Sequence, residues 1–109
     1  MPKSLPYRAT TRSGEMLDVE FKLHEQTQSA VRVAQVLSAV LETVDREVTL
    51  TGDTGNGDLL QGMAMALAVR AHMIPMQKDQ LADLVMTLVE TALTSAASGS
   101  SHTTPVGHG

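Results

Sequence analysis

The sequence of 109 residues contains no cysteine, which excludes a disulfide framework, a thiolate zinc site and a thiol nucleophile. Its aromatic residues are limited to Tyr7 and Phe21, so a core must be built from aliphatic side chains and from the seven methionines. With 42% hydrophobic residues the chain still has the composition of a folded protein. Its length is that of one domain.

Long apolar segments are also lacking. Residues 1–12, MPKSLPYRATTR, are polar and basic and do not resemble a signal peptide. The longest apolar stretch, residues 59–74, is interrupted by Gln61, Arg70 and His72 and is too short to span a bilayer. We therefore expect a cytoplasmic protein with no membrane partner.

The chain has no excess of positive charge. Its net charge of −4 gives no general attraction to nucleic acid, because that attraction depends on clustered lysine and arginine. One exception is the N-terminal segment, where Lys3, Arg8 and Arg12 meet no acidic residue before Glu15. We interpret these charges as a solvated strand edge that resists pairing with other sheets. The alternative is a nucleic-acid contact made by Arg8 and Arg12.

The N-terminal quarter of the chain alternates between apolar and polar residues. This period of two is strict over residues 17–24 and recurs from residue 5, which predicts two half-buried strands over residues 5–11 and 16–24. The sequence RSGE at residues 12–15 supplies a turn, so the two strands form a hairpin. Pro6 cannot donate a backbone hydrogen bond, which places the first strand at an edge.

From about residue 30 the period changes to three and four, which predicts three helices. The first covers residues 30–48, begins at Thr27 or Ser29 as its cap, and has one apolar face. Residues 48–51 alternate again and offer a short third strand. The second helix covers residues 58–74 and is apolar on nearly every side, which predicts that other elements enclose it.

Pro75 ends the second helix, and the third follows from about residue 76 to residue 96 with a wide apolar face. From residue 97 the composition is small and polar, which predicts a disordered tail over residues 97–109. The fold class is therefore α+β, with a hairpin packed against three helices in one domain over residues 1–96.

Three glycines lie in the sequence TGDTGNGD at residues 51–58, between two predicted elements. A phosphate-binding loop requires lysine and a hydroxyl residue after its glycines, where this chain has Asp58 and Leu59. An EF-hand also fails, because glycines replace two oxygen ligands. We interpret the segment as a turn in which Gly55 and Gly57 tolerate no side chain, with Asn56 or Asp58 capping the next helix.

The sequence contains no recognisable catalytic constellation. His102 and His108 lie in the predicted tail, where no rigid scaffold holds a catalytic group. We therefore expect neither an enzyme nor a bound cofactor, and assign no catalytic or metal-binding residue. The alternative is a small-molecule or metal-binding protein organised by the glycine-rich turn and His72.

The excess of apolar helical surface instead indicates an interaction protein, such as an adaptor, a regulatory subunit or an inhibitor. Methionine suits adaptable binding surfaces, and small residues make the second helix thin. We expect a homodimer formed through the apolar helices, and another protein as the partner. The candidate interface residues are Met63, Met65, Leu84, Met86 and Leu88.

Overall fold

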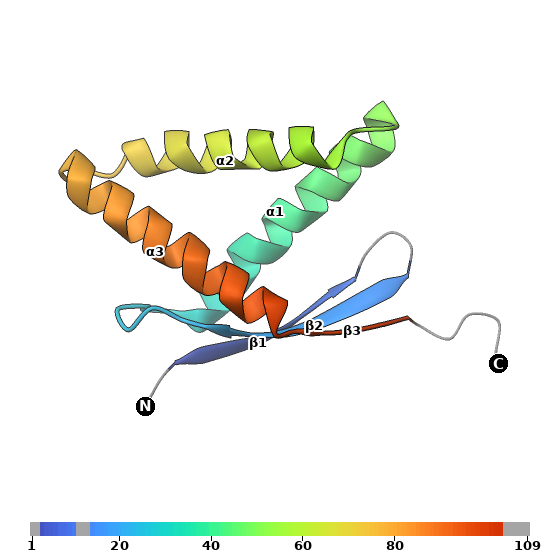
Figure 1. Ribbon diagram of the computed structural model, residues 1–109, viewed down its shortest axis with the longest axis horizontal. Helices are drawn as coiled ribbons and strands as arrows, with labels where there is room; N and C mark the ends of the chain where they lie inside the picture. Colours follow the sequence, from blue (N-terminus) through green and yellow to red (C-terminus); the bar gives the residue numbers. More distant parts are fainter. Residues whose placement is uncertain (1–2, 11–13, 104–109) are drawn as a thin grey trace. The chain divides into compact units, whose positions relative to one another are not determined.

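The computed structural model describes residues 3–10 and 14–103 of the chain. The elements in chain order are β1 (Ser4–Thr10), β2 (Glu15–Lys22), α1 (Ala30–Thr51), α2 (Asn56–His72), α3 (Lys78–Ala97) and β3 (Ser100–Thr103) (Figure 1). The N-terminal hairpin followed by three helices confirms the predicted α+β class.

The three strands form one antiparallel sheet in the order β1-β2-β3, with β2 in the centre. The predicted alternation is confirmed, because the apolar residues of β1 and β2 lie opposite one another on one face. These pairs are Leu5 with Phe21, Tyr7 with Val19, and Ala9 with Leu17. Val19 is buried at the centre of this face. The edge position of β1 agrees with the expectation from Pro6.

The third strand comes from residues 100–103, inside the segment that was expected to be a tail. β3 pairs with β2, with Ser100 opposite Asp18 and Thr103 opposite Glu15. Its sequence, SSHT, has no apolar pattern, so the strand depends on the backbone hydrogen bonds that the second edge of β2 offers. Residues 104–109, the rest of the expected tail, lie outside the described residues.

Residues 48–51 do not form the strand that their alternation offered, because α1 continues through them to Thr51. The hydroxyl groups of Thr49 and Thr51 donate hydrogen bonds, each 2.8 Å long, to the carbonyl oxygens four residues earlier. At the other end, the backbone N–H of Arg32 donates to Ser29 Oγ at 3.1 Å, which confirms Ser29 as the N-cap of α1.

Backbone contacts divide the chain into two compact units. The first unit, Met1–Val36 with Leu88–Gly109, contains the sheet and the adjoining ends of α1 and α3. Within it, the backbone N–H of Lys22 in β2 donates to Ser95 Oγ in α3 at 3.1 Å. The predicted domain boundary at residue 96 therefore falls in the last turn of α3, at the point where this helix meets the sheet.

The second unit, Leu37–Thr87, contains α2 and the halves of α1 and α3 that adjoin it. Its buried side chains in the described part are Ala71, near the end of α2, and Leu81, in the first turn of α3. Both lie next to the turn between these helices, where the backbone N–H of Ile74 donates to the Ala71 carbonyl oxygen at 3.0 Å. The core of this unit is therefore confined to one end of α2.

Candidate interaction surface

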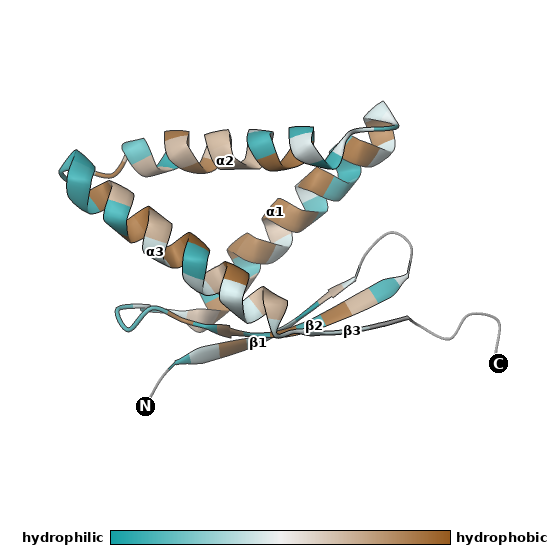
Figure 2. Ribbon diagram, viewed as in Figure 1, coloured by the Kyte–Doolittle hydropathy of each residue, from teal (hydrophilic) through white to brown (hydrophobic). Residues whose placement is uncertain are grey.

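Helix α2 is exposed to solvent along most of its length. Every residue from 60 to 70 is exposed, although this segment is rich in leucine, methionine, valine and alanine. Alanine, leucine and methionine are strong helix formers, which explains why the segment is helical without a buried face. In Figure 2 the brown and tan segments of this helix are interrupted by teal ones from its few polar residues. An apolar helix that water surrounds is unfavourable, so this surface is suited to being covered.

Two of the predicted interface residues lie on opposite sides of α2. Met63 and Met65 are two positions apart, which separates their side chains by roughly 200° around the helix. Met63 is 36% exposed and Met65 is 58% exposed. Both are accessible, but one partner helix can cover only one of them.

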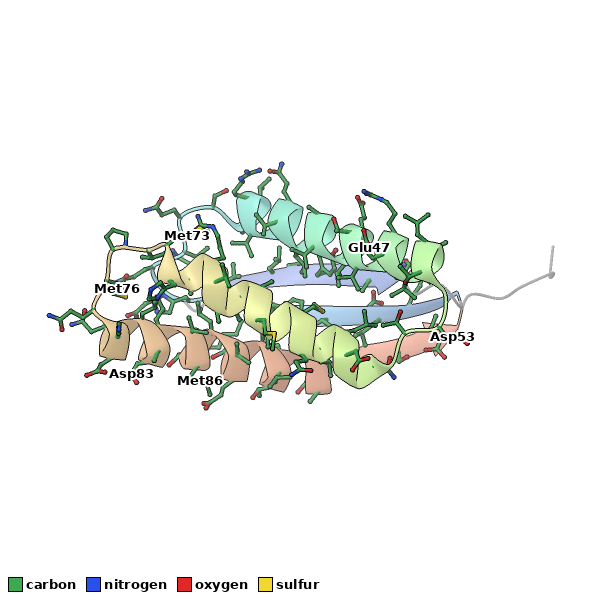
Figure 3. The ribbon with its side chains drawn as sticks, turned by 90° about the horizontal axis from the view of Figure 1, so that it is seen from above. Glu47, Asp53, Met73, Met76, Asp83 and Met86 are labelled. Carbon is green, nitrogen blue, oxygen red and sulfur yellow. The ribbon has the colours of Figure 1, made fainter. Side chains whose placement is uncertain are left out.

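The other predicted interface residues lie on α3. Leu84 is half-buried, and Leu88, four residues later, lies on the same side of the helix and is exposed. Met86 lies on the other side of α3 and is 55% exposed (Figure 3). These residues therefore also divide between two faces.

Three exposed apolar residues of α2 were absent from the predicted interface: Leu60, Leu67 and Val69. They were left out because methionine, and not leucine or valine, was taken as the mark of a binding surface on this helix. The even distribution of apolar residues around the helix predicted a helix enclosed by other elements, and this prediction was wrong, because residues 60–70 are all exposed. The exposure of helix α1 was also underestimated. One apolar face of this helix was expected to be covered, but α1 has no buried residue.

The glycine-rich segment is a joint between α1 and α2. Gly52, with φ of 84°, ends α1, and its N–H donates to the Val48 carbonyl oxygen at 3.0 Å in the αL motif. Gly55 is the N-cap of α2 with φ of −65°, and no side chain caps this helix. The expected caps Asn56 and Asp58 were therefore wrong, because both lie inside the first turn of α2. The left-handed conformation belongs to Gly52, and neither Gly55 nor Gly57 adopts it.

His72 lies far from the acidic residues that the metal or small-molecule alternative groups with it. Asp53 and Asp58 are exposed near the start of α2, whereas His72 is its last residue. Asp58 and His72 are fourteen positions apart in the helix, which is a rise of about 21 Å along its axis. Residues 3–10 and 14–103 contain no cluster of three or more acidic or histidine side chains that could hold a metal ion.

The basic N-terminal segment is engaged within the protein. Arg8 lies opposite Asp18, and its Nε and one terminal nitrogen donate to the two carboxylate oxygens at 2.6 and 2.9 Å. This hydrogen bonding and the charge of Asp18 raise the pKa of Arg8. Lys3 Nζ donates to the carbonyl oxygen of Thr27 at 2.7 Å. Arg12, the second candidate for a nucleic-acid contact, lies outside the described residues.

No family model, curated protein or solved structure that was compared with the chain matches it. Among the described helices, none combines the length and the apolar character that crossing a membrane requires.

Proposed function

We propose that this chain is a non-enzymatic protein-interaction module that forms a homodimer through its apolar helices. The observation that carries the proposal is the exposure of α2, whose residues 60–70 are all accessible to solvent. Covering a leucine, methionine or valine side chain contributes roughly 1.5–3 kcal/mol, so several such residues on one helix are a substantial driving force for association. As a dimer, the chain would act on another protein as an adaptor, a regulatory subunit or an inhibitor.

The cytoplasm is the proposed setting, since a chain without disulfides needs no oxidising compartment. The nucleic-acid alternative is weaker than the interaction proposal. The fork-to-fork pairing of Arg8 with Asp18 occupies the guanidinium that a phosphate would need. The apolar side chains of residues 60–70 in α2, by contrast, are all exposed.

Sedimentation velocity over a range of protein concentrations tests this proposal. We expect a species of twice the 11.6 kDa chain mass at tens of micromolar. Val69→Glu, which adds a charge to an exposed apolar position of α2, is expected to shift the population toward the monomer. Thr87→Glu, at an exposed polar position of α3, is the matched control and is expected to leave the dimer intact. A strictly monomeric wild-type chain at these concentrations would overturn the proposal.

A further inference from the structure

We infer that two copies of this chain pair their α2 helices in antiparallel orientation, with Met65 of both copies at the twofold axis. This inference rests on the proposed homodimer and specifies which face of α2 forms it. The face consists of five exposed residues that we call the Met65 stripe: Asp58, Gly62, Met65, Val69 and His72.

The spacing of these residues places them along one line of the helix. Asp58, Met65 and His72 are seven residues apart, and a heptad displaces a side chain by only about 20° around an α-helix. Gly62 and Val69 each follow the preceding member by four residues, so they lie beside the same line. The stripe runs the length of α2 from its first turn to its last residue.

Asp58 and His72 at the two ends of the stripe can pair by a hydrogen bond from the imidazole N–H to the carboxylate, which favours antiparallel pairing. Because Asp58 and His72 are each seven residues from Met65, a twofold axis at Met65 brings Asp58 of one copy opposite His72 of the other. The same operation repeats this contact at the other end. A parallel pair would instead place Asp58 of one copy against Asp58 of the other. Its two helix dipoles would also point in the same direction, which is unfavourable for helices side by side.

The middle of the stripe is suited to close contact. Gly62 has no atom within 4 Å of the position that a Cβ would occupy, so the backbone is open there to a second helix. The twofold axis brings Gly62 near Val69 of the second copy. The Val69 side chain is 61% exposed, and Gly62 has no side chain that would obstruct it. Met65 then meets Met65 of the second copy at the centre.

The opposite face of α2 is less suited to this role. That face carries Leu60, Met63 and Leu67, and it continues at the end of the helix to Ala71. Ala71 is only 7% exposed, so part of this face is already covered within the protein. The Met65 stripe is exposed at all five positions, so it offers the full length of α2 to a second copy.

The absence of cysteine makes the stripe directly testable by cross-linking. We expect Met65→Cys to form a covalent dimer under mild oxidation, seen as a doubled mass on a non-reducing gel. Met63→Cys, on the opposite side of the same helix, is the matched control and is expected to form no covalent dimer. As a second measurement, Asp58→Cys and His72→Cys chains are unfolded and refolded together. We expect a cross-link in the mixture and none in either variant alone.

The outcomes separate this inference from the homodimer itself. A sedimentation dimer in which Met63→Cys cross-links and Met65→Cys does not would overturn the stripe but leave the homodimer standing. A dimer in which Asp58→Cys cross-links alone would overturn the antiparallel orientation. A monomer in sedimentation would overturn both proposals.

Discussion

Gly99 lies against the backbone of Asp18. A Cβ at position 99 would stand 2.9 Å from the Asp18 carbonyl oxygen and 3.0 Å from Cγ2 of Val19. The chain leaves α3 at this point and enters β3, whose first residue, Ser100, pairs with Asp18. A glycine is therefore required for the chain to pass close enough to β2 to add a third strand.

We expect Gly99→Ala to destabilise the protein by about 1–3 kcal/mol, because the added methyl group meets rigid backbone rather than a flexible side chain. Urea unfolding followed by circular dichroism measures this loss. Gly57→Ala is the control, since no atom lies within 4 Å of its Cβ position, and it is expected to be neutral or slightly stabilising. Equal stability of Gly99→Ala and the wild type would contradict the close approach.

Gly52→Ala is expected to destabilise the protein by about 1–2 kcal/mol, because a side chain at φ of 84° is strained. Gly52→Asn is expected to lose less, because asparagine tolerates this conformation better than alanine. Thermal unfolding of both variants, beside Gly55→Ala at an ordinary φ of −65°, provides the comparison. If Gly55→Ala proved the more damaging change, the assignment of the helix end to Gly52 would fail.

Ser29→Ala is expected to cost about 1 kcal/mol of stability, because it removes the oxygen that accepts the Arg32 N–H at the start of α1. The free energy of unfolding in urea measures the effect. Thr27→Ala, at the other residue that the sequence offered as a cap, is expected to cost less. Ser29→Asp should retain most of the stability, since its carboxylate also accepts this hydrogen bond.

The midpoint of thermal unfolding is expected to rise with protein concentration. Association stabilises a folded chain by mass action, so the midpoint of a dimer depends on how much chain is present. Scans over a hundredfold range of concentration provide this measurement. A monomeric Val69→Glu variant serves as the control, because its midpoint is expected to stay constant. A constant midpoint in the wild type would argue against a dimer coupled to folding.

Duplex DNA is expected to show no mobility shift with this protein, even at low salt, since Asp18 engages the guanidinium of Arg8. Electrophoretic mobility and fluorescence anisotropy both measure such binding. Binding that weakens steeply with salt, and that Arg8→Ala together with Arg12→Ala abolishes, would instead support the nucleic-acid alternative.

The sequence predicted the hairpin well because burial on one face imposes a period of two, and Pro6 marks the edge. It did not predict β3, because residues 100–103 are held by backbone pairing and carry no apolar pattern. Residues 48–51 were misleading for a related reason. Thr49 and Thr51 are typical of strands, but their hydroxyls also hydrogen-bond within a helix, and α1 uses them in that way.

The candidate surface was predictable only in part. The apolar character of α2 is evident from its residues, and the structure adds that residues 60–70 are exposed. Met63 and Met65 were predicted together because both are methionines. Their positions around the helix were not considered, and the two side chains lie on opposite sides of it. The burial of Ala71 near the end of α2 could be found only from the three-dimensional structure.

The pairing of Glu15 with Thr103 has a consequence for the order of folding. The β1–β2 hairpin joins neighbouring segments and can form early, whereas β3 is made only after all three helices have been synthesised. Closing so long a loop is entropically costly and slows the formation of contacts between distant residues. During synthesis, β2 therefore has one unpaired edge until α3 is complete, and in that interval the nascent chain is most vulnerable to aggregation.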